Sequence, residues 1–354
     1  KLGGNISSSS INQGFAAVEY NHLGTYAKFL SANIYYGRLY SSVKLNGRID
    51  LPGRMPFALT TSFTMNRWDY YNSSPDPFFE DVRPSYLINN ERNVKVELST
   101  PVKYNGVVKI GYSRSKTKNS YYQIKSFNKA DTADITYFDA DNLSLKLEKN
   151  TLNRKQYPTK GEYNLIKFNY IKGYEDFVSG STSNLEDFNN SLHYWLNLEL
   201  VHDKYFNLGN HFTLGYLAKA VISNKSFFGN YTSTILSSQA FTPTPHSKTL
   251  FIENLRLNNY LALGIKPIIN INSLIDLRFE MYGYLPYKKI ISVNNGIAEY
   301  DKEFSDYSYL MSSSLVFNTI VGPASFSVNY YEKDDKNLYF IFNFGYIIFN
   351  KKGI

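Results

Sequence analysis

The chain has 354 residues, no cysteine, 17% aromatic residues and a net charge of +8. The lack of cysteine excludes a disulfide scaffold and a Cys-ligated metal site, and no segment approaches the roughly 18 consecutive apolar residues of a membrane helix. Lysine and arginine are spread along the chain rather than clustered, so we expect no nucleic-acid partner.

Alternation of apolar and polar residues with a period of two predicts β-strands along the whole chain. In LSLKLEK (143–149), for example, the leucines share one face and the polar residues share the other. The expected strands span 2–8, 13–20, 25–36, 38–50, 56–66, 92–101, 106–116, 142–150, 162–172, 192–202, 210–222, 259–268, 272–283, 307–317, 321–331 and 337–349.

The connections between these strands alternate in length. Those after odd-numbered strands are mostly long: 67–91, 117–141, 173–191, 223–258 and 284–306. Those after even-numbered strands are mostly short: 21–24, 51–55, 102–105, 269–271 and 318–320. A soluble β-sandwich has no reason to place its long loops at one end, whereas an outer-membrane barrel has short periplasmic turns and long extracellular loops.

The sequence therefore predicts an all-β fold, a 16-stranded antiparallel transmembrane β-barrel in the outer membrane of a Gram-negative bacterium. One barrel would cover residues 1–354, with its sixth extracellular loop at about 223–258 and outer-membrane lipids as its surroundings. Aromatic residues near the long-loop ends would form an interfacial girdle. The girdle would comprise Tyr35, Tyr36, Tyr40, Trp68, Tyr70, Tyr71, Tyr174, Tyr194, Trp195, Tyr282, Tyr284, Tyr307, Tyr309, Tyr330 and Tyr331.

The aromatic stretch NLYFIFNFGYIIF (337–349) is expected to be the last strand, with one face on lipid. Pairing with the first strand would close the barrel and remove the exposed edge. Gly345 and Phe349 would belong to a C-terminal signal read by the barrel-assembly machinery, with Phe349 as its terminal aromatic residue. The further NKKGI departs from the rule that the chain ends on that residue.

Several stretches resemble the bacterial surface antigen superfamily, which includes the barrel-assembly insertase and the two-partner secretion translocators. LGGNISSSS looks like the opening strand, and Asn21 and Gly24 hold the positions of an N-x-x-G turn. Gly322 and Pro323 look like the start of the penultimate strand. An insertase-type barrel is therefore one reading of the chain.

A closer resemblance is to the C-terminal barrel of Bacteroidetes patatin-like phospholipases. LRLNNYLALG, LRFEMYGYLPY and GYIIFNKK carry it. It implies a parent with a patatin domain and a periplasmic linker domain, both outside this chain, and a barrel that anchors or exports the hydrolase. The alternatives are a passenger-free insertase or translocase and a passive pore. The sequence leaves undecided whether the barrel forms a homo-oligomer or joins a larger outer-membrane complex.

The resemblance also suggests an ion pair inside the barrel. The insertase branch folds an Arg-Gly-aromatic motif of loop six against an acid on the thirteenth strand. Here Arg256 lies near the end of that loop, followed by Leu and Asn, and Glu280 lies on the thirteenth strand. Asp276, Arg278 and Glu280 share one face, which must be the lumen face because charge avoids lipid.

Catalytic and metal motifs are not evident in the sequence. The G-x-S-x-G elbow of a patatin enzyme is missing, and VSGSTSN (178–184) reads as a loop. No cofactor is expected, and any enzymatic activity would belong to the parent. The acidic stretch DTADITYFDAD (131–141) is compatible with two interpretations, a calcium site and an ordinary solvated loop. The histidines form no metal-ligand pair; they are His22, His193, His202, His211 and His246.

Overall fold

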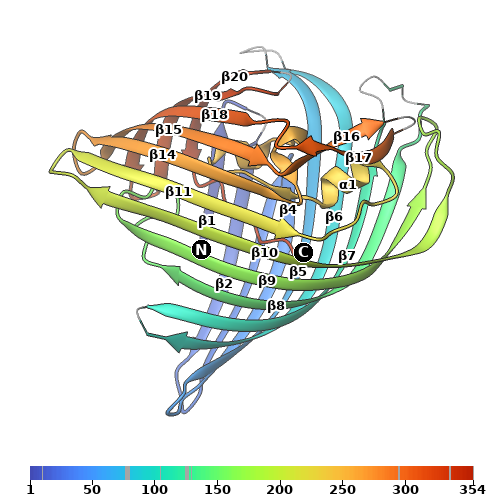
Figure 1. Ribbon diagram of the computed structural model, residues 1–354. Helices are drawn as coiled ribbons and strands as arrows, with labels where there is room; N and C mark the ends of the chain where they lie inside the picture. The colour runs from blue at the N-terminus through green and yellow to red at the C-terminus, as the bar shows by residue number, and fades with distance from the viewer. Residues whose placement is uncertain are drawn as a thin grey trace.

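The computed structural model describes residues 1–9, 11–75, 80–103, 105–123, 127–128, 130–293, 296–334 and 336–353. Sixteen antiparallel strands close into one barrel, in the order β1 to β11, β14, β15, β18, β19 and β20 (Figure 1). This confirms the predicted fold class. In the described part of the chain, no helix is long and apolar enough to cross a membrane.

Each barrel strand pairs with its neighbours in sequence order. The barrel strands are β1 (Leu2–Ser7), β2 (Gln13–His22), β3 (Ala27–Gly37), β4 (Tyr40–Leu51), β5 (Phe57–Pro75), β6 (Glu80–Val102), β7 (Gly106–Tyr121), β8 (Asp134–Asn150), β9 (Gly161–Val178), β10 (Phe188–Asn207), β11 (Phe212–Ser223), β14 (Tyr260–Asn270), β15 (Ile275–Pro286), β18 (Ser308–Thr319), β19 (Gly322–Tyr331) and β20 (Leu338–Gly345). The remaining elements are α1 (Tyr231–Ser237), β12 (Gln239–Ala240), β13 (Arg256–Leu257), β16 (Lys288–Val293), β17 (Ile297–Glu303) and two 3-10 turns, His246–Thr249 and Glu253–Leu255.

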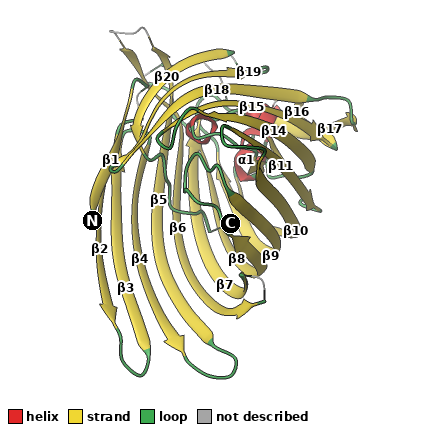
Figure 2. Ribbon diagram, turned by 90° about the vertical axis from the view of Figure 1, so that its left-hand side faces the viewer, coloured by secondary structure: helices red, strands yellow, loops and turns green. Residues whose placement is uncertain are grey.

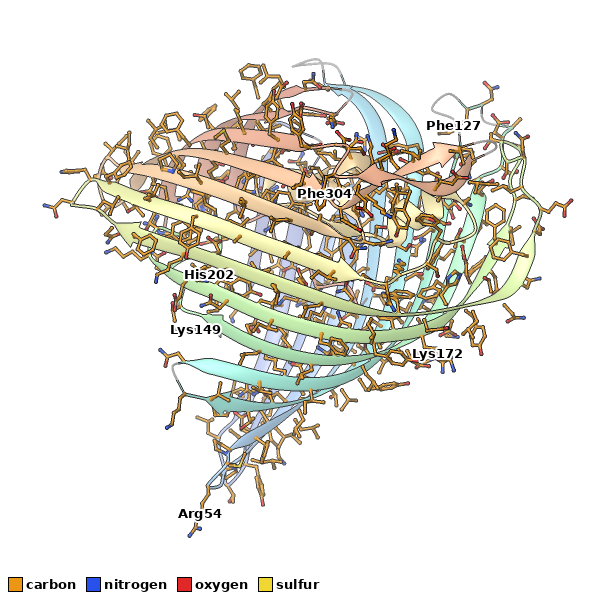
Figure 3. All side chains as sticks on the ribbon, viewed as in Figure 1. Arg54, Phe127, Lys149, Lys172, His202 and Phe304 are labelled. Atoms are coloured by element: carbon orange, nitrogen blue, oxygen red, sulfur yellow. The ribbon has the colours of Figure 1, made fainter. Side chains whose placement is uncertain are left out.

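The outer face of the barrel is apolar, as period-two alternation requires. Leu143, Leu145 and Leu147 on β8 are 55%, 50% and 41% exposed. Residues at matching positions of the other strands are exposed in the same way, and side chains project outward from the part of the wall that faces the viewer in Figure 3. A continuous apolar surface of this extent is unfavourable in water and favourable in a lipid bilayer.

Strands β5 to β10 are longer than the sequence predicted. Each adds five or more residues to its expected length, mainly at the long-loop end, so most of 67–91 and part of 117–141 are strand rather than loop. Likewise, 284–306 contains the hairpin β16–β17. The prediction failed there because polar residues continue the hydrogen-bonded ladder. Asn89 pairs with Asn119 across β6 and β7, for instance, without apolar alternation to mark the strand.

About half of the expected aromatic girdle faces inward instead. Among its members, Tyr36, Tyr174, Tyr194 and Tyr307 are exposed on the outside. Those buried on the inner side are Tyr40, Trp68, Tyr70, Trp195, Tyr282, Tyr284 and Tyr331, and the side chain of Tyr71 lies outside the described residues. Residues of the same strand at odd and even positions point to opposite faces, so a shared height in the barrel does not imply a shared face.

The barrel wall is uneven in height. The β2–β3 and β4–β5 hairpins extend below the other strands in Figure 1, and Arg54 marks the lowest tip in Figure 3. Asn21 is still within β2, where it pairs with Phe29, and Gly24 lies in the following turn. The wall encloses helix α1 and several loops, which Figure 2 shows inside the sheet.

Candidate functional site in the barrel lumen

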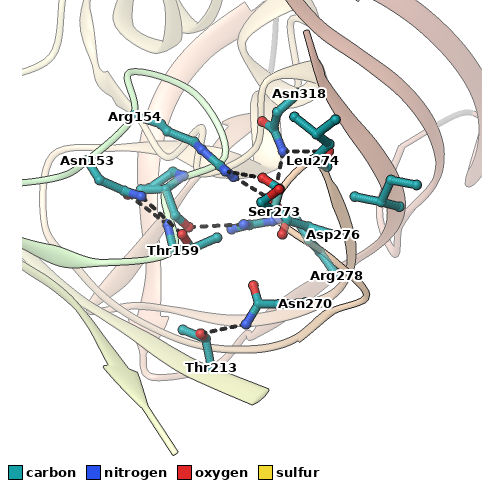
Figure 4. Close-up of polar contacts among 12 residues, drawn as sticks. Asn153, Arg154, Thr159, Thr213, Asn270, Ser273, Leu274, Asp276, Arg278 and Asn318 are labelled. Carbon is teal, nitrogen blue, oxygen red and sulfur yellow. Dashed lines mark hydrogen bonds and ion pairs between the residues drawn. The ribbon is translucent and has the colours of Figure 1, made fainter. Parts of the chain in front are cut away.

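Three segments enter the lumen, and the first is the turn between β8 and β9, residues 151–160. Asn153 closes the turn: its Oδ1 accepts hydrogen bonds from the backbone N–H of Thr159 at 3.0 Å and of Lys160 at 3.1 Å. Arg154 then reaches across to the opposite wall, where Nη1 lies 2.6 Å from Asp276 Oδ2 (Figure 4). The turn is therefore anchored to a strand more than 100 residues later.

The thirteenth barrel strand, β15, receives this turn. Arg278 is 1% exposed, donates from Nη1 to the carbonyl oxygen of Pro158 at 3.0 Å and pairs with Glu280 at 3.1 Å. Glu280 also accepts from the hydroxyl of Tyr282 at 2.7 Å. Asp276, beside them on the inner face, accepts from Asn318 Nδ2 at 3.0 Å. The acid and base on β15 thus serve to hold the turn in place.

Loop six, residues 224–259, is the second segment in the lumen. Asn230 caps helix α1, and its Nδ2 donates to the hydroxyl of Tyr121 at 2.6 Å. Glu175 on β9 accepts a hydrogen bond from the backbone N–H of Gly229 in loop six at 3.1 Å. The same carboxylate lies 2.9 Å from Nε2 of His193 on β10. Loop six is therefore fixed to the wall by buried polar contacts.

Apolar packing secures the far half of loop six. Phe241 is 1% exposed and packs against Tyr260, Tyr282 and Tyr284, with ring centroids 5.7 to 6.2 Å apart. Aromatic pairs at these distances each add stability beyond the area that they bury. Tyr282 and Tyr284, two inward-facing members of the predicted girdle, therefore hold loop six against the wall.

Arg256 does not form the expected pair with Glu280. Its guanidinium carbon lies 4.4 Å from the ring centroid of Phe251, and Glu280 pairs with Arg278 instead. Among the described residues, Arg256 forms no ion pair. The motif position is thus occupied by a buried arginine stacked on an aromatic ring.

The third segment is the C-terminal tail, residues 346–353. Strand β20 ends at Gly345, whose φ of +102° turns the chain inward. The prediction of a lipid-facing strand as far as Phe349 is therefore wrong after Gly345. Glycine permits this turn because it lacks Cβ; a Cβ at Gly345 would lie 2.2 Å from the carbonyl oxygen of Gly4.

The tail crosses the lumen and packs on β4 to β8. Phe349 packs with its ring tilted against Trp68 and edge-on to Tyr40, at ring-centroid distances of 4.4 Å and 4.8 Å. Farther on, the backbone N–H of Gly353 donates to Glu91 Oε1 at 2.7 Å. The tail also meets the β8–β9 turn, since the N–H of Ile347 donates to Gln156 Oε1 at 3.0 Å. Sequence reasoning missed this path, although a polar, dibasic end is unsuited to a lipid-facing strand.

The seam that closes the barrel is short. Strands β1 and β20 share three residue pairs, Asn5–Gly345, Ile6–Phe344 and Ser7–Asn343, whereas β19 and β20 share seven. Gly322, with φ +146°, and Pro323 begin β19 beside this seam. This seam is therefore the shortest ladder in the wall, and the β1–β2 ladder, with four pairs, is the next shortest.

The remaining candidate residues do not assemble into a site. Asp139 forms ion pairs with Arg114 and Lys116 on the outer face of β8, whereas Asp134 accepts a hydrogen bond from Gln123. These two carboxylates therefore do not meet at one calcium-binding position. No group of His, Asp and Glu suited to a metal ion occurs within the described ranges. Within the expected loop 67–91, the side chains of 71–84 lie outside the described residues.

The three inserted segments and the wall enclose a cavity of about 760 Å³. Loop-six and tail residues on its lining include Lys225, Lys248, Arg256 and Lys352. Burial lowers the pKa of Lys225, which donates to the carbonyl oxygen of Ser237 at 2.6 Å. It also lowers the pKa of Lys352, and repulsion from Arg256 adds to the effect. The surroundings of both lysines thus disfavour their charged form.

Comparison with known proteins identifies the fold. No protein-family model and no curated protein matches the sequence. The barrel is similar to BamA from Haemophilus ducreyi lacking POTRA domains 1–3, with a TM-score of 0.63 at 14% identity. It is also similar to CdiB from Escherichia coli, with a TM-score of 0.50 at 10% identity.

In both comparisons 97% of this chain is aligned, and the alignment spans 69% of the BamA chain and 62% of the CdiB chain. At these identities the similarity shows that the chain shares the barrel fold of these two proteins. Together with the apolar outer face, this fold places the chain in the outer membrane of a Gram-negative cell.

Proposed function

We propose that this barrel is the outer-membrane anchor of an N-terminal patatin-like acyl hydrolase, which it holds within reach of phospholipid esters. The observation that carries the proposal is the filled lumen. Loop six, the 151–160 turn and the C-terminal tail are all fixed to the wall, so the barrel is suited to holding a position in the membrane. The C-terminal stretches that resemble patatin-like phospholipases support a patatin domain as the passenger.

The anchor proposal is tested by the intact mass of the native protein from its outer membrane, with peptide mapping of anything before Lys1. A mass tens of kilodaltons above 40.7 kDa, with a G-x-S-x-G peptide in the extra part, is the expected result. A mass near 40.7 kDa, with no serine-hydrolase peptide in the same membrane complex, would contradict it.

A passenger-free insertase or translocase is the second candidate, and the short β1–β20 seam favours it. Ile6 and Phe344 are paired across the seam, and the natural chain has no cysteine. A barrel carrying Ile6→Cys and Phe344→Cys can therefore be locked by one disulfide. Under the anchor proposal the locked barrel still retains the hydrolase at the membrane. Loss of substrate export or insertion on locking, reversed by reduction, would favour the translocase.

A further inference from the structure

The lining of the lumen cavity carries a large excess of positive charge. Four carboxylates face it: Glu91, Glu199, Asp203 and Glu280. Nine cationic side chains face it: Lys155, Lys219, Lys225, Lys248, Lys266, Lys351, Lys352, Arg256 and Arg278. The cavity therefore holds five more positive than negative groups, and the cations come from all three inserted segments as well as from the wall.

Three of the carboxylates are already neutralised by wall residues. Glu199 pairs with Lys219 at 2.9 Å and Asp203 with Lys266 at 2.7 Å, in addition to the Arg278–Glu280 pair. The fourth, Glu91, accepts from Asn66 Nδ2 at 2.9 Å and from the tail N–H of Gly353. The lining part of the wall thus supplies four carboxylates and three cations, and Glu91 is the carboxylate that these cations leave unpaired.

The other six cations form no ion pair within the described residues. They are Lys155, Lys225, Lys248, Arg256, Lys351 and Lys352. Arg256 is 7% exposed, whereas Lys155, Lys248, Lys351 and Lys352 remain accessible to water inside the lumen. Each of these six lies on an inserted segment, so the cations without an ion pair are supplied by the three segments.

Aromatic rings accompany the charges. Lys352 Nζ lies 5.9 Å from the ring centroid of Trp68, and Lys225 Nζ lies 4.6 Å from that of Trp195. Cation–π contacts stabilise a cation only in part, and Lys225 and Arg256 are buried without an ion-pair partner among the described residues, which is costly. A multivalent anion would relieve this cost for several groups at once.

We propose that the lumen cavity is a binding site for a multivalent phosphate anion. Arg256 would supply a planar fork for two phosphate oxygens, and Lys352 and Lys248 would supply point charges beside it. The volume of about 760 Å³ lies within the range of roughly 300–1,000 Å³ that is typical of small-molecule sites. The proposal does not depend on a passenger enzyme, and its failure leaves the anchor proposal standing.

The chain provides its own probe. It has two tryptophans, Trp68 and Trp195, and both line the cavity. The experiment is a titration of the detergent-solubilised full chain with sodium pyrophosphate, followed by intrinsic fluorescence at constant ionic strength. We expect a saturable change that sodium chloride does not reproduce. A response that merely follows ionic strength would overturn the proposal.

Two variants test the assigned residues. Arg256→Gln with Lys352→Gln should weaken pyrophosphate binding about tenfold or more, because charge-assisted hydrogen bonds are lost. Lys118→Gln with Lys172→Gln removes the same charge from exposed outer positions and should leave binding unchanged. If the first variant fails to fold, judged by its unboiled gel mobility, Lys248→Gln with Lys351→Gln replaces it. Equal weakening in the control would overturn the assignment.

The phosphate has two possible sources, a free compound or a lipid headgroup that enters at the short seam. Nanodiscs of phosphatidylcholine, with and without phosphatidic acid, whose phosphomonoester can carry two charges, distinguish them. If phosphatidic acid alone produces the fluorescence change and pyrophosphate then adds nothing, the ligand is a headgroup. If pyrophosphate acts equally in both nanodiscs, the ligand is a soluble phosphate. No response in any arm would reject the site.

Discussion

At the scale of single residues, Arg278 shows how the lumen holds its contents. Its guanidinium group is buried, yet it pairs with Glu280 and donates to the backbone of the 151–160 turn. A buried ion pair adds little net stability, but removal of one partner leaves an uncompensated charge. The arrangement therefore fixes geometry, namely the docking of a turn onto a distant strand.

Substitution of this arginine tests that view. Arg278→Gln should lower the free energy of unfolding by about 3 kcal/mol, because Glu280 would stay buried without its cation. Urea unfolding in lipid vesicles, followed by tryptophan fluorescence, measures the change. Arg114→Gln breaks the Arg114–Asp139 pair on the outer face, where Arg114 is 56% exposed, and should leave the free energy of unfolding nearly unchanged. Similar costs for the two variants would contradict the buried-charge argument.

At the scale of elements, the sequence predicts the wall well and its contents poorly. Strands with apolar alternation, such as β8 and β14, are predicted because lipid imposes that alternation on one face. The 151–160 turn and the tail after Gly345 carry no such period, since their environment is made by the rest of the chain. For the same reason, the sequence does not separate inward-facing from outward-facing aromatic residues. It also does not predict that Arg278, rather than Arg256, pairs with Glu280.

The turn at Gly345 decides where the last element goes. Gly345→Ala should destabilise the barrel by about 1–3 kcal/mol, because its positive φ and the nearby Gly4 carbonyl oxygen both exclude a Cβ. The same urea experiment measures this cost. Gly283→Ala is the matched control, since a Cβ there meets no atom within 4 Å, and it should change stability by less than about 0.5 kcal/mol. A tolerated Gly345→Ala would show that the tail does not need this turn.

At the scale of the whole molecule, the barrel combines a continuous lipid-facing wall with an interior that is occupied by the 151–160 turn, loop six and the C-terminal tail. Loop six packs on aromatic residues of β14 and β15, and the tail packs on those of β4 and β5. The β8–β9 turn joins the two sides through Arg154 and Gln156. A passive pore would need an open path through this interior, so conductance separates the pore reading from the others.

Planar-bilayer recordings provide the last prediction. We expect the full chain to show rare, brief openings, because the three segments obstruct the lumen. Truncation after Gly345 should produce longer and larger currents, because it removes Phe349 from its seat on Tyr40 and Trp68. Leu145→Val on the lipid face is the control and should behave like the unaltered chain. A steady open current from the full chain would instead favour a pore, and an unchanged current after truncation would show that loop six and the 151–160 turn close the lumen without the tail.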